Sequence, residues 1–215
     1  MSRSMKEMIK LSFGEEVGNA VSHGVAAVFY LFALPVIAVY AYIKGGIVYS
    51  IGLSVYGIGM FLMFLGSCIY HSMEFGSNQK YVMRKLDHSF IYLAIAGTYT
   101  PVLLSIVKGN LALILLAIEW LTTIGGIIMT AVSKNYHKRL ALTLYLVMGW
   151  IAILILPTLI ANASFLFLTF IVIGGIFYTI GVIFYNQKWP YAHFIWHIFI
   201  ILASIAHFIA VVFFI

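Results

Sequence analysis

Residues 191–213, YAHFIWHIFIILASIAHFIAVVF, form a continuous apolar stretch that contains histidines. A segment that crosses the bilayer core needs about 20 predominantly apolar residues, and this stretch is long enough. An ionisable residue inside a span is costly, so it indicates a functional site. His193 and His197 are four residues apart, which places both rings on one face of a helix. The stretch therefore predicts a transmembrane helix with a functional site near its start.

The rest of the chain has the same apolar character. Its 215 residues are 64% hydrophobic and only 8% charged, whereas soluble domains contain about 25% charged residues. We therefore expect an all-α integral membrane protein. The net charge of +6 does not predict nucleic-acid binding, because the basic residues lie in loops beside the spans, where membrane topology accounts for them.

Seven stretches are long and apolar enough to span a membrane: 20–43, 47–70, 86–107, 109–131, 140–160, 164–185 and 191–213. Glycine, asparagine, proline or charged residues separate them. Only residues 108–110 separate the third stretch from the fourth, which predicts a tight helical hairpin. We expect residues 1–19 to form a short cytoplasmic amphipathic segment and residues 20–215 to form a single seven-helix transmembrane domain.

The basic residues predict the orientation of this bundle. Ten of the twelve lysines and arginines lie at the N-terminus or in the second, fourth and sixth loops, and only Lys44 and Lys108 lie on the other side. Cytoplasmic loops are enriched in basic residues, so we expect a cytoplasmic N-terminus and a C-terminus outside. The end of the second span and the starts of the third and seventh then share one depth near the cytoplasmic face.

Five polar residues meet at this depth. His71, His193 and His197 would supply three neutral imidazoles, which with one water make an open, catalytic type of zinc site. Zinc lowers the pKa of bound water toward about 7 and can polarise a carbonyl group. Asp87 would hold that water and act as a general base. Ser67 lies four residues before His71 and would hydrogen-bond the water or a developing oxyanion.

Each of these residues also has a simpler explanation. His71 alone would meet lipid headgroups, and Asp87 alone would pair with neighbouring basic residues. His193 and His197 would join an aromatic belt at the membrane interface. The coincidence of the whole set at one depth favours a metal site. Its donors fit zinc best, although iron and manganese bind similar ligands.

Other polar residues lie outside this set. Glu16, Asn19 and His23 recur at positions i, i+3 and i+7, so they either cap the first helix or form a polar strut toward the site. His207 lies about 15 Å deeper than His197, too far for the same ion; it would hydrogen-bond a neighbouring helix or, alternatively, belong to a proton path. Glu119 falls inside the fourth span, where a carboxyl group is protonated, paired or facing a cavity.

The combined motifs resemble the hemolysin III family, the bacterial branch of the progestin and adipoQ receptor superfamily. The patterns are E-x-x-N-x-x-[ST]-H, S-x-x-x-H, L-D and H-x-x-x-H, at Glu16, Asn19, Ser22 and His23, at Ser67 and His71, at Leu86 and Asp87, and at His193 and His197. The resemblance extends from Glu16 to His207.

This resemblance implies seven transmembrane helices with a cytoplasmic N-terminus in a bacterial plasma membrane. It implies zinc bound by His71, His193 and His197, with Asp87 and Ser67 contacting the zinc-bound water. Related receptors and alkaline ceramidases imply hydrolysis of lipid amides. The family name implies a different activity, the lysis of red cells by pore formation.

Three functions follow from these observations. The first is a zinc-dependent hydrolase that acts on an amide or ester of a membrane lipid. The second is a pore-forming cytolytic protein, although the chain has no amphipathic charged span to line a pore. The third is a non-enzymatic regulator of membrane lipid state with structural zinc.

Overall fold

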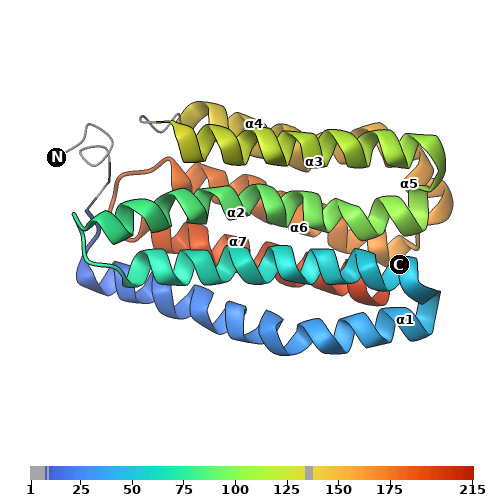
Figure 1. The fold of residues 1–215 in the computed structure, drawn as a ribbon, viewed down its shortest axis with the longest axis horizontal. Coiled ribbons are helices and arrows are strands. Elements are labelled where there is room, and N and C mark those ends of the chain that lie inside the picture. The colour runs from blue at the N-terminus through green and yellow to red at the C-terminus, as the bar shows by residue number, and fades with distance from the viewer. Residues whose placement is uncertain (1–7, 9, 134–137) are drawn as a thin grey trace.

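The computed structural model describes residues 8, 10–133 and 138–215, and within them the chain is a bundle of helices without strands (Figure 1). By length and composition, six of the described helices could cross a membrane. The predicted all-α membrane bundle is thereby confirmed. The helices are α1 (Phe13–Ser72), α2 (Asn78–Val102) with a π-helical turn (Leu103–Val107), α3 (Gly109–Val132), α4 (Lys138–Trp150) with a 3-10 turn (Ile151–Ile155), α5 (Leu156–Asn162), α6 (Phe165–Tyr185) and α7 (Ala192–Phe213).

Helix α1 reverses direction at Gly46. Sixty residues of straight helix would measure about 90 Å, three times the thickness of the bilayer core. Gly46 has φ 75° and ψ −166°, a conformation open to glycine because it lacks a β-carbon. The two halves of α1 then lie antiparallel (Figure 1), with the hydroxyls of Tyr30 and Tyr56 2.9 Å apart. The reversal falls within the break expected at residues 44–46.

The returning half of α1 packs closely against α2 through three glycines. They are seven residues apart and lie on one face of the helix: Gly52, Gly59 and Gly66. A β-carbon added to Gly59 would lie 2.8 Å from the carbonyl oxygen of Leu93, and one added to Gly66 would lie 3.7 Å from the Cα of Asp87. Small residues allow this approach of two helices in a membrane. The packing brings the end of α1 beside the Asp87 turn of α2.

The first turns of α1 pack equally closely against the start of α7. A β-carbon on Gly14 would lie 3.0 Å from the hydroxyl oxygen of Tyr191, and one on Gly18 would lie 3.1 Å from the ring of Phe194. Tyr191 precedes α7 in a left-handed conformation with φ 64°. These contacts bring the predicted polar stripe of residues 16–23 to the start of α7.

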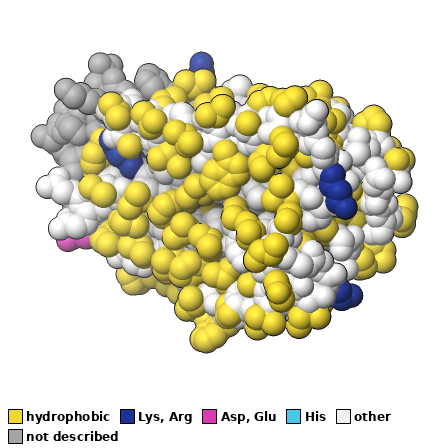
Figure 2. All heavy atoms as spheres, turned by 45° about the vertical axis from the view of Figure 1, so that its right-hand side comes forward, with side chains coloured by type: hydrophobic (Ala, Val, Ile, Leu, Met, Phe, Trp, Pro, Cys, Tyr) yellow, Lys and Arg dark blue, Asp and Glu magenta, His cyan; other side chains and the backbone are white. Residues whose placement is uncertain are grey.

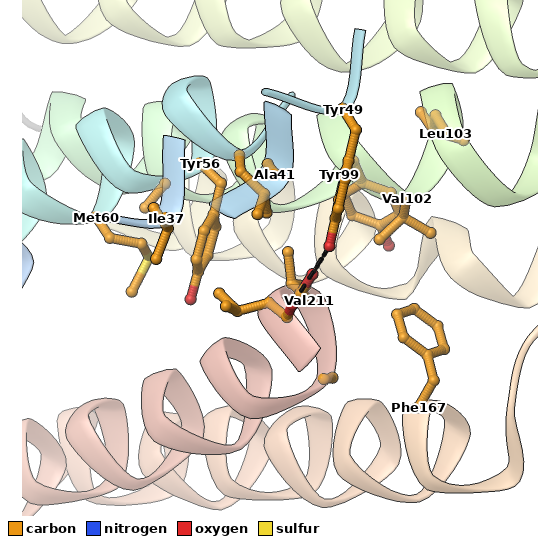
Figure 3. Close-up of a cluster of buried hydrophobic side chains, with 14 of the residues drawn as sticks. Ile37, Ala41, Tyr49, Tyr56, Met60, Tyr99, Val102, Leu103, Phe167 and Val211 are labelled. Carbon is orange, nitrogen blue, oxygen red and sulfur yellow. Dashed lines mark hydrogen bonds between the residues drawn. The ribbon is translucent and has the colours of Figure 1, made fainter. Parts of the chain in front are cut away.

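An apolar core runs through the bundle, and Figure 3 shows its part near Tyr49 and Val211. The hydroxyl of Tyr49 donates to the carbonyl oxygen of Val211 at 3.2 Å, and that of Val212 lies at 3.3 Å. These bonds attach the last turn of α7 to the returning half of α1, near the reversal at Gly46. The end of the bundle near Gly46 is therefore closed by apolar packing, whereas polar groups lie at the end that contains the start of α7.

The outer surface is apolar. Figure 2 shows hydrophobic side chains over most of the face in view, with lysine or arginine at only a few points. Large side chains such as Phe32 and Val36 are 71% and 66% exposed. A water-soluble protein rarely exposes so large an apolar area, so this surface is suited to contact with lipid.

Two helices begin well before the apolar stretches that predict them. Helix α1 starts at Phe13 rather than near residue 20, and α2 starts at Asn78 rather than at residue 86. Ser12 caps α1 by accepting from the Glu15 amide at 3.2 Å, and Ser77 caps α2 in the same way. Hydropathy locates lipid contact, whereas a helix continues through polar residues until its cap. Residues 1–7 and 9 of the expected amphipathic segment lie outside the described residues.

Candidate metal centre

Three histidines meet at one end of the bundle, which we call the histidine end. His71 lies in the last turn of α1, and His193 and His197 lie in the first two turns of α7. One ring nitrogen from each lies within 4.8 Å of the others. The ring centroids are 4.8 to 5.2 Å apart. This group can hold a metal ion, and its members are the three histidines that the sequence predicts as metal ligands.

The free ring nitrogens fit a metal ion. Nε2 of His193 and Nε2 of His197 are 3.2 Å apart. Two nitrogens bound to one tetrahedral zinc, each at about 2.0–2.1 Å, lie roughly 3.3 Å from each other. Nε2 of His71 is buried and has no hydrogen-bond partner within the described residues. Buried polar atoms usually have partners, so an ion that accepts all three lone pairs would satisfy them.

Glu16 orients the His71 ring. Nδ1 of His71 donates to Oε2 of Glu16 at 2.6 Å, which leaves Nε2 as the nitrogen with a free lone pair. Metal-binding histidines typically donate their second N–H to a carboxylate or carbonyl in this way. Asn19 approaches the same ring, with its Nδ2 3.4 Å from Nδ1. The sequence left two interpretations of the stripe, a helix cap or a polar strut toward the site. The contacts of Glu16 and Asn19 with His71 fit the strut, and the residue that caps the helix is Ser12.

His23, the third residue of the stripe, stacks on a candidate ligand. Its ring lies 3.8 Å from that of His197, centroid to centroid, at an interplanar angle of 24°. Phe64 meets it edge-on at 4.9 Å. His23 is 2% exposed, and neither of its ring nitrogens has a hydrogen-bond partner within the described part of the chain. His23 thus connects the candidate ligand His197 to the adjoining cavity, which it lines.

A cavity of about 310 Å³ opens beside the histidines. Its polar end is formed by His23, Ser67 and Asp87, and Asp87 is 8% exposed. Its remaining walls are mostly apolar and come from helices α2 and α4–α7; they include Ile95, Leu156, Leu159, Phe167, Ile171 and Ile200. One end of the cavity thus has a carboxylate, a hydroxyl and the imidazole of His23, which stacks on the candidate ligand His197.

A family model described as haemolysin-III related matches residues 11–208. The chain belongs to the hemolysin III family. Hemolysin-3 from Bacillus cereus is 37% identical over 202 residues, which cover 94% of this chain and 92% of that protein. A hemolysin-3 homolog from Bacillus subtilis (strain 168) is 36% identical over 201 residues, 93% of this chain and 94% of that protein. The resemblance drawn from the motifs is confirmed.

A more distant relative is human. The protein named monocyte to macrophage differentiation factor is 30% identical over 166 residues, which cover 73% of this chain and 67% of that protein.

Two other histidines of this hemolysin III family chain lie outside the metal-binding group. His207 donates from Nε2 to the carbonyl oxygen of Ile171 in α6 at 3.2 Å, which is the expected bond to a neighbouring helix, and it also borders the cavity. Nδ1 of His88 lies 2.6 Å from the carbonyl oxygen of Arg84. Hydrogen bonds of this kind account for both rings without a metal.

Lys85 does not pair with Asp87, as the simpler explanation of that aspartate supposed. Its ammonium donates to the carbonyl oxygens of Ala131 and Ser133, at 2.7 and 3.1 Å. Nδ1 of His88 lies 3.8 Å from Oδ2 of Asp87, and the positive charge of Arg84 also acts on this carboxyl group. Asp87 lines the cavity as well.

Lys80 is the residue that sequence reasoning missed. Its basic charge contributed only to the predicted orientation, yet the structure buries it against Glu16, 2.7 Å from Nζ to Oε1. The two residues are 64 positions apart, and no local spacing connects them. The only signal for Lys80 in the sequence was its position, in the first turn of the helix that carries Asp87.

Proposed function

We propose that this hemolysin III family protein is a membrane-embedded, zinc-dependent hydrolase that acts on an amide or ester of a membrane lipid. One observation carries the proposal: two buried histidines and a half-buried one form a group that can hold a metal ion, beside a mostly apolar cavity that Asp87 and Ser67 line. Ligand pockets that combine an apolar lining with a few convergent polar groups are typical of sites for small molecules.

The proposal includes a topology of seven spans. The reversal at Gly46 divides α1 into two halves, each long enough to cross the bilayer. With the excess of basic residues facing the cytoplasm, the N-terminus and the histidine end lie on that side of a bacterial plasma membrane. A lipid substrate would then present its scissile bond near the cytoplasmic headgroup layer.

The residues of the chain have separate tasks in this proposal. His71, His193 and His197 would hold zinc, which when bound supplies Lewis acidity and an activated water. Asp87 would accept a proton from the attacking water and return it to the leaving amine or alkoxide, so that the acyl–heteroatom bond breaks with no net proton change. Ser67 would donate a hydrogen bond to the oxygen that becomes negative.

The cavity supports a lipid with an acyl chain. Its walls beyond His23, Ser67 and Asp87 are mostly apolar, so an acyl chain placed there is removed from water at each methylene. The carbonyl carbon at the head of that chain would then lie beside Asp87. Exclusion of water from this chamber would also strengthen the polar interactions at its end.

A second candidate, cytolysis, rests on the name of the Bacillus cereus relative, Hemolysin-3. Ion and water pathways are lined by carbonyl, charged or polar groups. The mostly apolar cavity wall favours an acyl chain over such a pathway. Leakage of dye from liposomes that contain the purified protein tests this candidate directly.

The test of the hydrolase begins with metal content. The protein is purified in detergent without chelators, its zinc is measured by mass spectrometry, and the loaded protein is incubated with ceramides, other N-acyl lipids and lipid esters. We expect one zinc per chain and release of a fatty acid. Asp87→Asn should retain zinc and lose hydrolysis by about 10²-fold or more. A zinc-loaded protein that is inert toward the whole panel would refute the enzyme and leave the structural-zinc regulator.

A further inference from the structure

Lys80 is almost completely buried at the histidine end, with its side chain 1% exposed. Lysine is almost never fully buried unless it is paired, and hydration of its ammonium is expensive to remove. Its position in the first turn of α2 would allow the side chain to reach solvent by snorkelling. The inward orientation therefore has to be explained by its partners.

The Lys80 ammonium has three partners that fix its position. Nζ donates to Oε1 of Glu16 at 2.7 Å and to the carbonyl oxygen of Met73 at 3.1 Å. It also lies 4.8 Å from the centroid of the Tyr70 ring, within the range of a cation–π contact. An ammonium has three N–H donors, as many as these partners. The side chain links the start of α1, its end and the first turn of α2.

Glu16 stands between Lys80 and the candidate metal centre. Its Oε1 accepts from Lys80, and its Oε2 accepts from Nδ1 of His71 at 2.6 Å. Because one oxygen is held by the ammonium, rotation of the carboxylate is restricted and the other oxygen stays directed at His71. Charge-assisted bonds of this kind are shorter and stronger than those between neutral groups.

We propose that Lys80 is a positioning residue of the metal centre, which acts through Glu16 to hold the His71 ring with Nε2 facing His193 and His197. The inference rests on the proposed metal centre and adds to it a residue outside the four family motifs. Outer partners of metal ligands change metal affinity by about 10- to 100-fold when they are lost. Lys80 does not contact His71 itself; it fixes Glu16, which does.

Lys85 provides a matched control on the same helix. Its ammonium also has two oxygen acceptors, the main-chain carbonyls of Ala131 and Ser133, and it lies 5.2 Å from the ring of Tyr81. Lys85→Met therefore removes a lysine with similar contacts and leaves the Glu16–His71 bond in place. A general loss of helix attachment would appear in both variants.

The experiment measures the zinc dissociation constant of detergent-purified protein by competition with a chelator. We expect Lys80→Met to weaken zinc binding by about 10-fold or more and Lys85→Met to change it by less than about twofold. Glu16→Gln should weaken binding by about 10- to 100-fold. Adding Lys80→Met to Glu16→Gln should produce little further loss, because residues in one network are not additive. The visible spectrum of cobalt-loaded Lys80→Met should also differ from that of the wild type.

Several outcomes would overturn the inference. Lys80→Met with wild-type zinc affinity, wild-type cobalt spectrum and reduced thermal stability would make Lys80 a structural fastener of α1 and α2. Losses from Glu16→Gln and Lys80→Met that multiply would show independent actions. If Lys80→Met does not fold, Lys80→Gln keeps an N–H donor and is judged by the same criteria. A wild-type protein that binds no zinc would overturn the proposed metal centre itself.

Discussion

Two glutamates of this protein have opposite surroundings. Glu16 at the histidine end has a partner for each carboxylate oxygen, His71 on one side and Lys80 on the other. Glu119 in α3 is 0% exposed, and within the described residues neither of its oxygens has a hydrogen-bond partner. The more deeply buried carboxyl group, that of Glu119, is therefore not the one connected to the candidate metal centre. The two carboxyl groups differ in the donors around them, and those of Glu16 include a candidate metal ligand.

The largest expected effect is the loss of the proposed zinc ion when its ligands are removed. The variant His193→Ala/His197→Ala removes two of three proposed ligands, so zinc content should fall from one per chain to near zero. Mass spectrometry of the purified protein measures it. His207→Ala is the control, because that ring bonds to the Ile171 carbonyl and lies outside the group. Equal zinc in the double variant and the wild type would place the metal elsewhere.

The next largest effect is a difference in zinc affinity between variants of Glu16 and Glu119. Glu16→Gln should weaken zinc binding by about 10- to 100-fold, because an amide orients the His71 N–H less strongly than a carboxylate. Glu119→Gln should leave the zinc affinity unchanged. Chelator competition on both variants provides the comparison. Similar losses in the two would mean that Glu119 is coupled to the site.

A smaller effect is expected from the packing that assembles the histidine end. Gly59→Ala would place a β-carbon 2.8 Å from the Leu93 carbonyl oxygen, so α1 and α2 must separate. We expect a loss of about 1–3 kcal/mol in stability, seen as a lower midpoint in thermal unfolding. At Gly125 an added β-carbon meets nothing within 4 Å, and alanine there should be neutral or slightly stabilising. A neutral Gly59→Ala would show that the close approach is unnecessary.

The smallest effect concerns Glu119 itself. Glu119→Gln keeps the shape of a buried side chain and removes an ionisable group from the membrane interior, where such a group is costly. We expect a change in unfolding free energy between zero and about 1 kcal/mol in favour of the variant. Thermal unfolding at neutral pH measures it. Marked destabilisation would show that Glu119 has a partner in the folded protein after all.

Hydropathy predicted the helical membrane bundle and the break near Gly46, because long apolar stretches and turn residues have direct physical meanings. The spacing of His193 and His197 also predicted their shared face. The contact between Lys80 and Glu16 was beyond such reasoning. It depends on the reversal of α1, which brings the start and the end of that helix together beside α2. Local periodicity carries no information about which distant turns meet.

The sequence also held a signal that went unused. Gly52, Gly59 and Gly66 recur every seven residues and mark the face of α1 that contacts α2. Glycine is frequent throughout the chain, so a single glycine does not identify a contact between helices. The seven-residue period of these three glycines does. The local departures from α-helix at Leu103–Val107 and Ile151–Ile155 were not predicted either. They lie next to prolines, which remove a backbone donor from the helix.

The candidate ligands lie far apart in the chain, which has a consequence for biosynthesis. His71 lies at the end of α1, while His193 and His197 lie at the start of α7. Membrane helices emerge from the ribosome in chain order, so nascent protein that lacks α7 has one of the three ligands. High-affinity metal capture would begin only when α7 is inserted and docked. A bound ion would then show that the nascent chain had been made and assembled as far as α7.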